Sequence, residues 1–248
     1  MTAVALAPTG KRIVTTVRIH VANPWTTLIA PWLILIGVFL LNFAIWRIIL
    51  IAVDGRAIDP DAFRNNGGVS WVLFYMIVVA IQAMNQTFSF VVGLGSTRRD
   101  YFLGTGITFV GISIFYGLGI ALLSQVERLT NGWGVNGAFF APGPFGDLPL
   151  WEFALFYALA MMFMMFVGSA IGAMFVRWGA SGIMTFFAVL ALLILGVLYL
   201  IAKTNAWAQF GHFFTNHSLM ELALFSLPIT LIAGLAGYAI MRRATPKG

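Results

Sequence analysis

The chain has 248 residues, of which 60% are hydrophobic, 15% are aromatic and only 9% are charged. About a quarter of the residues in a soluble domain are charged, so this composition, with a mean hydropathy of +0.94, excludes a soluble enzyme, a nucleic-acid-binding domain and a disordered protein. The net charge is +6 and the pI is near 10.1. In a membrane protein such an excess of basic residues is explained by their positions along the chain.

The first element along the chain is a basic, amphipathic segment at residues 10–25. Its apolar helical face includes Val14 and Val21, and the opposite face includes Arg12 and Thr16. Alternation of apolar residues in this segment is also compatible with a strand, so periodicity alone leaves both possibilities open. Because a basic helix beside a membrane span suits the cytoplasmic leaflet, we expect an interfacial helix here.

Six segments are apolar and long enough to cross a bilayer, which takes about 20 residues. They are residues 26–46, 69–94, 101–123, 150–176, 180–202 and 219–241. None contains Lys, Arg or Asp, and each run is continuous, whereas a barrel strand alternates over about 10 residues. The expected fold is an all-α membrane protein with six transmembrane helices in a single domain, residues 1–248.

The distribution of Lys and Arg predicts the orientation of these helices. Six spans place both termini on one side, where the connecting segments hold nine basic residues and one acid. The opposite side holds five basic residues and seven acids, two of which lie at the starts of spans. Since cytoplasmic loops are enriched in Lys and Arg, both termini are expected in the cytoplasm. The basic residues then report orientation, and no nucleic acid partner is needed to explain them.

Two acids fall inside the predicted spans, and both lie close to a helix start. Glu152 and Glu221 are placed where the helix macrodipole favours a carboxylate. We therefore expect them to stabilise helix N-termini and to take no part in proton coupling.

A polar stripe runs along the second span. Gln82, Asn85, Gln86 and Ser89 recur at i, i+3, i+4 and i+7, which places them on one face of a helix. Carboxamides are costly against lipid, so this face is expected to meet protein or water. Hydrogen bonding that holds the bundle together and the wall of a transport path are equally compatible with the stripe, and Asn42 in the first span is a possible partner.

Searches for catalytic and cofactor motifs find none in this chain. Neither a nucleotide-binding P-loop nor a G-x-S-x-G hydrolase motif is present. With no cysteine and three scattered histidines, we expect no metal site. A G-x-x-x-G pattern formed by Gly168 and Gly172 in the fourth span is typical of close helix packing, within a chain or between chains.

The turn after the second span carries the clearest motif. Residues 94–104, Leu-Gly-Ser-Thr-Arg-Arg-Asp-Tyr-Phe-Leu-Gly, resemble the corresponding loop of ABC-2-type transporter permeases, in which bacterial members show a Gly-x-Ser-Arg-Arg-x-(Phe/Tyr)-Phe-x-Gly-like run. Thr97 is an addition to that run, between its Ser and Arg positions. Chain length, six spans, cytoplasmic termini and an amphipathic first helix are similar as well. Without the resemblance, positive-inside anchoring alone would explain the two arginines.

The resemblance implies a membrane subunit of an exporter in the bacterial cytoplasmic membrane. Such a subunit pairs with a second copy or a paralogue, and with cytosolic ATPase subunits that carry the ATP and Mg²⁺. Coupling to the ATPase would fall to Arg98, Arg99, Asp100 and Tyr101, and the polar stripe would border the translocation pathway.

The resemblance also implies that residues 203–218, before the sixth span, dip back toward the membrane. A self-sufficient channel or secondary transporter and an ATP-independent membrane scaffold are the alternatives. The sequence does not specify the transported substrate.

Overall fold

The computed structural model describes residues 8–53, 59, 61–146 and 148–243, and these form helices and connecting turns with no strand among them. The first elements are α1 (Thr9–Ala22), the π-helix η1 (Trp25–Ile29) and α2 (Ala30–Ala52). Next come the short 3-10 helix η2 (Gly68–Ser70), α3 (Trp71–Gln82), the π-helix η3 (Ala83–Thr87) and α4 (Phe88–Gly93). The remaining elements are α5 (Arg98–Leu129), the irregular turns η4 (Gly132–Asn136) and η5 (Gly143–Phe145), α6 (Leu150–Lys203), α7 (Trp207–Asn216) and α8 (Leu219–Arg242).

The all-helical fold expected from the sequence is confirmed for the described residues. Five helical segments are long and apolar enough to cross a membrane, which agrees with a multi-pass membrane protein. These segments are Trp25–Ala52, Gly68–Gly93, Arg98–Leu129, Leu150–Lys203 and Leu219–Arg242. Five are found where six were predicted, because the fourth and fifth predicted spans both lie within α6.

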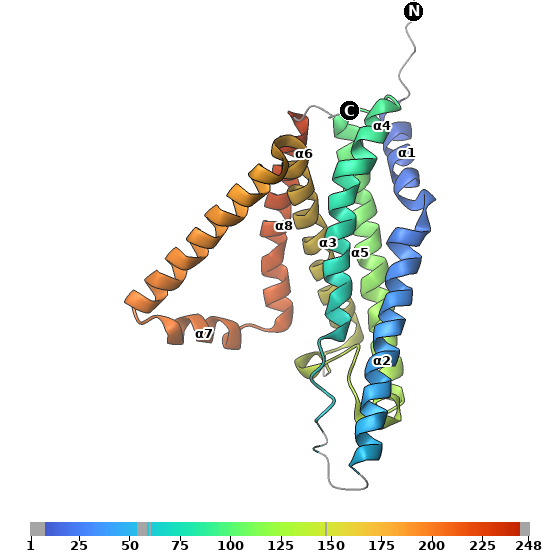
Figure 1. Cartoon of the computed structure of the whole chain (residues 1–248), viewed down its shortest axis with the longest axis vertical. Coiled ribbons are helices and arrows are strands. Elements are labelled where there is room, and N and C mark those ends of the chain that lie inside the picture. Colours follow the sequence, from blue (N-terminus) through green and yellow to red (C-terminus); the bar gives the residue numbers. More distant parts are fainter. Residues whose placement is uncertain (1–7, 54–58, 60, 147, 244–248) are drawn as a thin grey trace, which may run out of the picture.

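A sharp bend divides α6 into two arms. The helix has 54 residues, which at 1.5 Å per residue is about 80 Å, far longer than the ~30 Å hydrocarbon core. Gly179 interrupts it with φ 70° and ψ −160°, a backbone conformation that is accessible to glycine but not to residues with a Cβ. In Figure 1 the ribbon turns back at this point, so that the two arms of α6 run in different directions.

The first arm of α6, residues 150–178, lies at the centre of the bundle and contacts α3, α5 and α8. Glycines bring the helices close together. A Cβ added at Gly168 would lie 2.7 Å from the carbonyl oxygen of Ile77, and one at Gly172 would lie 2.8 Å from the Cβ of Met84. Gly168 and Gly172 therefore lie where α6 packs against α3 and η3 of the same chain.

Replacing Gly168 with Ala is expected to lower the free energy of unfolding by about 1–3 kcal/mol, because the added methyl group overpacks a helix contact. Gly196 on the second arm is the matched control, since nothing lies within 4 Å of an added Cβ there. Gly196→Ala is expected to be neutral or slightly stabilising through helix propensity. Thermal unfolding of the purified protein in detergent measures both. Equal effects of the two substitutions would contradict the close packing at Gly168.

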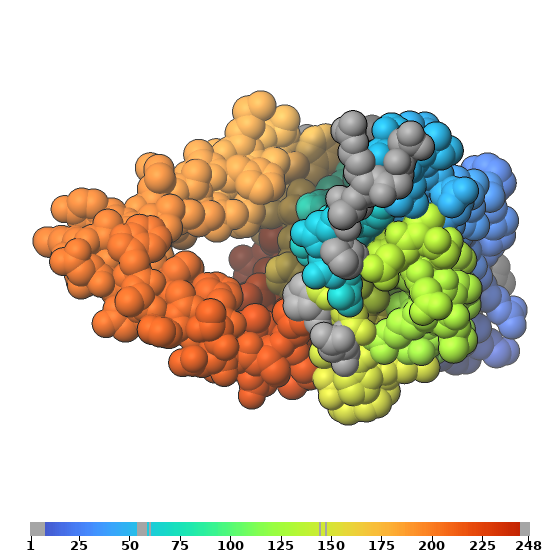
Figure 2. Space-filling model, turned by 90° about the horizontal axis from the view of Figure 1, so that it is seen from below, coloured from blue at the N-terminus to red at the C-terminus, as the bar shows by residue number. Residues whose placement is uncertain are grey.

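The second arm of α6 and α7 stand away from the bundle. In Figure 1 the second arm of α6, α7 and α8 form three sides of an open triangle. The view from below shows the opening between them (Figure 2). The most apolar 18-residue stretch of α6 contains no buried residue, and neither does α7. A helix that is apolar all round is stable when it is surrounded by lipid or by another protein. Residues 203–218, expected to dip back toward the membrane, include the helix α7.

The amphipathic first segment is a helix, α1, and its polar face packs against α5. The polar residues Arg12, Thr16 and His20 face α5, and Thr16 is fully buried. Val14 and Val21, assigned to a lipid-facing side, are about half exposed. α1 therefore packs along the first turns of α5 through its polar face, because Asp100 and Thr105 of α5 provide hydrogen-bonding partners for it.

A buried carboxylate orders the glycine-rich connection between α5 and α6. Glu127 is 4% exposed, and four N–H groups donate to its oxygens at distances of 2.8–3.2 Å. The donors are the backbone amides of Phe139, Phe140 and Ala141 and the indole of Trp133. These backbone amides are not paired within a helix or sheet, and the carboxylate is their hydrogen-bond acceptor instead.

The basic residues gather at one end of the bundle. Four parts of the chain lie together at this end: the beginnings of α1 and α5, the bend in α6 and the end of α8 (Figure 1). The described basic residues of these segments are Lys11, Arg12, Arg18, Arg98, Arg99, Arg177, Arg242 and Arg243. We call this the basic end; the only acid among its described residues is Asp100. The opposite end holds Glu152, in the first turn of α6, and Glu221, which forms a capping box with Ser218 at the start of α8.

Candidate functional site

The turn that joins α4 to α5, residues 94–97, lies at the basic end. Gly95 has a φ of 88°, which allows the chain to reverse tightly after α4. The hydroxyl of Thr97 accepts a hydrogen bond from the backbone N–H of Asp100 at 3.1 Å and caps α5. Thr97, the addition to the family-like pattern, therefore has a local structural role.

Two of the four residues expected to couple to an ATPase are turned inward. Asp100 is 2% exposed and forms an ion pair with Arg12 of α1, with 2.6 Å between Nε and Oδ2. Tyr101 is also buried, and its hydroxyl donates to the backbone carbonyl of Ala83 in η3. Their side chains contact this chain, so in this conformation they do not form a surface for a partner.

The other two residues, Arg98 and Arg99, differ from each other in their contacts. Arg98 is half-buried, and its guanidinium donates to the backbone carbonyl of Arg242 at 2.7 Å, at the end of α8. This contact joins the start of α5 to α8, where carbonyl groups lack helical partners. Arg99 is exposed and makes no ion pair with a described residue. Of the four, Arg99 presents the most accessible charge.

Two π-helices face each other inside the bundle, and tyrosine hydroxyls pair with their carbonyl groups. In η1, the carbonyl of Thr26 accepts from Tyr75 at 3.1 Å and that of Thr27 accepts from Tyr116 at 2.9 Å. The contact between Tyr101 and Ala83 serves η3 in the same way. π-helical turns occur frequently at functional sites, and here residues of both turns line one cavity.

That cavity is polar and has a volume of about 240 Å³. It lies between α1, η1, the α3–η3 helix and α5. Its polar lining consists of His20, Asn23, Thr26, Thr27, Gln82, Gln86, Thr87 and Thr108. These side chains are amides, hydroxyls and one imidazole. The cavity therefore offers uncharged hydrogen-bond donors and acceptors, with no carboxylate and no nucleophilic thiol.

His20 lies where α1 meets α5. Its Nε2 is 2.9 Å from the hydroxyl oxygen of Thr105, and the direction of that hydrogen bond follows from the imidazole tautomer. Burial lowers the pKa of His20 to about 4, because desolvation disfavours the charged imidazolium. At pH 7 the side chain is neutral, so it adds no charge to the cavity.

The polar stripe of the second span is divided by η3. Gln82 and Gln86 line the cavity, whereas Asn85 and Ser89 do not. The Oδ1 atom of Asn85 is buried without a hydrogen-bond partner among the described residues. The i, i+3, i+4, i+7 pattern assumes 3.6 residues per turn. In the wider π-helical turn of η3, Gln82 and Gln86 stay on one face, whereas Asn85 and Ser89 do not.

Asn42 does not contact the stripe. Its Oδ1 accepts a hydrogen bond from Asn66 at 2.8 Å, and its amide donates to the carbonyl of Val38. Asn66 belongs to the connection after α2. Asn42 therefore holds this connection to α2, at the end of the bundle opposite to the basic end.

The sequence interpretation missed the role of α1 in forming the cavity. Its signal was present in the residue spacing, because Arg12, Thr16 and His20 are four residues apart and share a helical face. The contribution of Glu127 had no comparable signal, since its four donors come from residues 6–14 positions away in an irregular loop.

Among the described residues, no group of three or more His, Asp or Glu side chains is placed to hold a metal ion. Comparison with known proteins adds no assignment: no protein-family model, curated protein or solved structure matches the chain.

Proposed function

We propose that this chain is the membrane-spanning subunit of an ATP-binding-cassette exporter, driven by a separate cytosolic ATPase subunit that binds the ATP and Mg²⁺. Both arms of α6 would cross the bilayer, which makes six spans. The basic end would face the cytoplasm of a bacterium, following the positive-inside rule. In this proposal the chain has no ATPase site and no cofactor of its own, and its catalytic partner docks at the basic end.

The observation that carries the proposal is the set of contacts around the turn of residues 94–97. Asp100 joins this turn to α1, and Arg98 joins it to α8. A force applied by a partner at Arg99 would therefore reach α1, α5 and α8 together. Such a connection supports the rigid-body rocking of helices that alternating access requires.

The pathway in this proposal passes beside the polar cavity, with Gln82 and Gln86 on its wall. A second permease copy, or a paralogue, would cover the exposed second arm of α6, because the described part of this chain buries no residue of the most apolar stretch of α6. The second candidate function is an ATP-independent channel or secondary transporter. The polar cavity favours it, since a hydrated cavity within one chain could admit a small polar solute unaided.

The experiment replaces Arg99 with Glu and uses Arg18→Glu as the matched control. Arg18 is also exposed and lies at the same end of the bundle, on α1. The chain is co-expressed with its ATPase subunit, and complex formation and permease-stimulated ATP hydrolysis are measured. Arg99→Glu is expected to reduce the stimulation at least tenfold, because a reversed charge at a docking surface costs several kcal/mol.

Normal coupling in Arg99→Glu, or an equal loss in Arg18→Glu, would contradict docking at this turn. Transport that proceeds in vesicles containing the chain alone would favour the channel or secondary transporter.

A further inference from the structure

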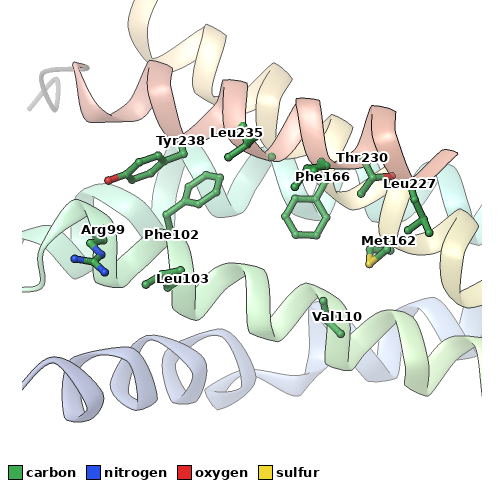
Figure 3. A pocket seen from close by; sticks show the side chains of 12 residues that line it. Arg99, Phe102, Leu103, Val110, Met162, Phe166, Leu227, Thr230, Leu235 and Tyr238 are labelled. Atoms are coloured by element: carbon green, nitrogen blue, oxygen red, sulfur yellow. The ribbon is translucent and has the colours of Figure 1, made fainter. Parts of the chain in front are cut away.

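A long apolar groove lies between α5, α6 and α8, within the candidate membrane-spanning segments. Figure 3 shows it lined by Phe102, Val110, Met162, Phe166 and Leu235. Its volume is about 580 Å³. Gly234 contributes to the concave wall, because an added Cβ there would approach the ring of Phe166 to 3.1 Å. A groove of this size and lining suits a hydrocarbon chain.

One end of the groove is cationic. Arg99 and Tyr238 lie together at that end, while Val110 and Met162 lie at the other (Figure 3). Tyr238 also lines a neighbouring pocket of about 380 Å³ at the basic end. The cations of that pocket are Arg177, Arg242 and Arg243. Besides Arg99, three further guanidinium groups therefore lie beside this end of the groove.

These guanidinium groups are not neutralised within the described part of the chain. Its ion pairs are Arg12 with Asp100 and Arg64 with Asp61, and neither involves the groove. Asp100, the only described acid at this end, is thus already paired. Arg177 is held in place by a contact of its Cζ with the Trp178 ring, 4.7 Å from the ring centroid.

We propose that the groove and the three arginines form a binding site for an anionic phospholipid of the leaflet at the basic end. An acyl chain lies in the groove, and the phosphate lies beside Tyr238, within reach of Arg177, Arg242 and Arg243. The charge argues for this occupant, since guanidinium groups pair with phosphate in a bidentate geometry, and basic pockets between membrane helices hold anionic headgroups. The site requires only that these helices span a bilayer, so it is independent of the exporter function.

The experiment titrates the purified full chain in detergent with phosphatidylglycerol or with phosphatidylcholine of the same acyl chains, and counts bound lipid by native mass spectrometry. Phosphatidylglycerol is expected to bind about 100-fold more tightly, because each of the three arginines contributes about fivefold in affinity for an anionic headgroup. Removing two of the arginines, with Arg242→Gln and Arg243→Gln together, is expected to weaken phosphatidylglycerol binding about 30-fold. Phosphatidylcholine has the same phosphate, but its choline cation cancels the headgroup charge, so its binding is expected to weaken much less.

Two controls separate a specific site from a charged surface. Lys11→Gln with Arg18→Gln removes the same charge from the same end of the bundle, and is expected to leave phosphatidylglycerol binding within twofold. Val110→Trp fills the groove and is expected to weaken both lipids, whereas Ile114→Trp, on an exposed residue one turn along α5 and outside the groove, is expected to change neither.

Three results would overturn the proposal. Equal binding of the two lipids by the native chain would show that the arginines do not recognise an anionic headgroup. An equal loss in the Lys11 and Arg18 variant would leave only diffuse surface charge. Unchanged binding in Val110→Trp, or loss of a dimer in that variant without loss of lipid, would show that the groove holds something other than an acyl chain.

Discussion

Glu127→Ala is expected to lower the free energy of unfolding by at least about 4 kcal/mol, the largest effect of any single substitution considered for this chain. The carboxylate accepts hydrogen bonds from three backbone amides and one indole, and its loss leaves these buried donors without an acceptor. Each unsatisfied buried group costs about 1–3 kcal/mol. The expected reduction in Tm is roughly 10 °C, since 1 kcal/mol corresponds to about 2–4 °C in a chain of this size.

Thermal unfolding in detergent, followed by tryptophan fluorescence, measures this effect. Glu127→Gln is expected to be destabilising as well, because the new NH₂ group meets N–H donors where an oxygen accepted them. Glu152→Gln is the control, since this acid in the first turn of α6 contributes only a dipole interaction of about 0.3–1 kcal/mol. A Tm for Glu127→Ala within 2 °C of the native value would rule out the anchoring role of Glu127.

The ion pair between Arg12 and Asp100 is expected to respond unequally to removal of its two members. Arg12→Ala leaves Asp100, only 2% exposed, as a buried carboxylate without its cation, which costs about 3–5 kcal/mol. Asp100→Asn leaves Arg12, which is 16% exposed and can extend its guanidinium to water along a flexible stem. The arginine substitution is therefore expected to be the more destabilising of the two.

Thermal unfolding of the two single variants and of Arg12→Met with Asp100→Asn tests this asymmetry. The double variant is expected to recover part of the loss, because it leaves no uncompensated charge inside. If Asp100→Asn proves more destabilising than Arg12→Ala, then the burial of the Asp100 carboxylate does not determine the cost of breaking the pair.

Several elements of this protein follow from short-range patterns. Continuous apolar runs identified the helical segments that are long and apolar enough to cross a membrane, although two of the six runs lie within the single helix α6. The pattern Ser-x-x-Glu at residues 218–221 likewise corresponds to a capping box in the structure. In each case the cause lies within a few residues of the effect, so no knowledge of the tertiary structure is needed.

The polar residues were harder to assign, and α1 shows why. Its valines are exposed, which is compatible with contact to lipid. The sequence did not show that Arg12 and His20 pair with residues of α5 and that Thr16 is buried against it. Which face of an amphipathic helix is buried follows from what lies opposite, and the opposing residues are more than 80 positions away.

The second span shows the same limit in its local geometry. Gln82 and Gln86 line one cavity, but the π-helical turn η3 takes Asn85 and Ser89 out of it. A period of 3.6 residues cannot predict this insertion, because the wider turn is stabilised by a distant partner, the hydroxyl of Tyr101.

Amino-acid composition and the order of apolar and basic segments were sufficient to establish an all-helical membrane protein with its positive charge concentrated at one end. The helical spans and the placement of the charges both depend on whether each segment is surrounded by lipid or by water. That preference is a property of each residue by itself. Other features arise only when distant helices meet. They are the burial of Asp100 and Tyr101, the exposure of Arg99, the polar cavity and the groove beside Tyr238. Their physical basis is pairwise: a buried polar group needs a particular partner, and only the packed chain determines which partner it finds.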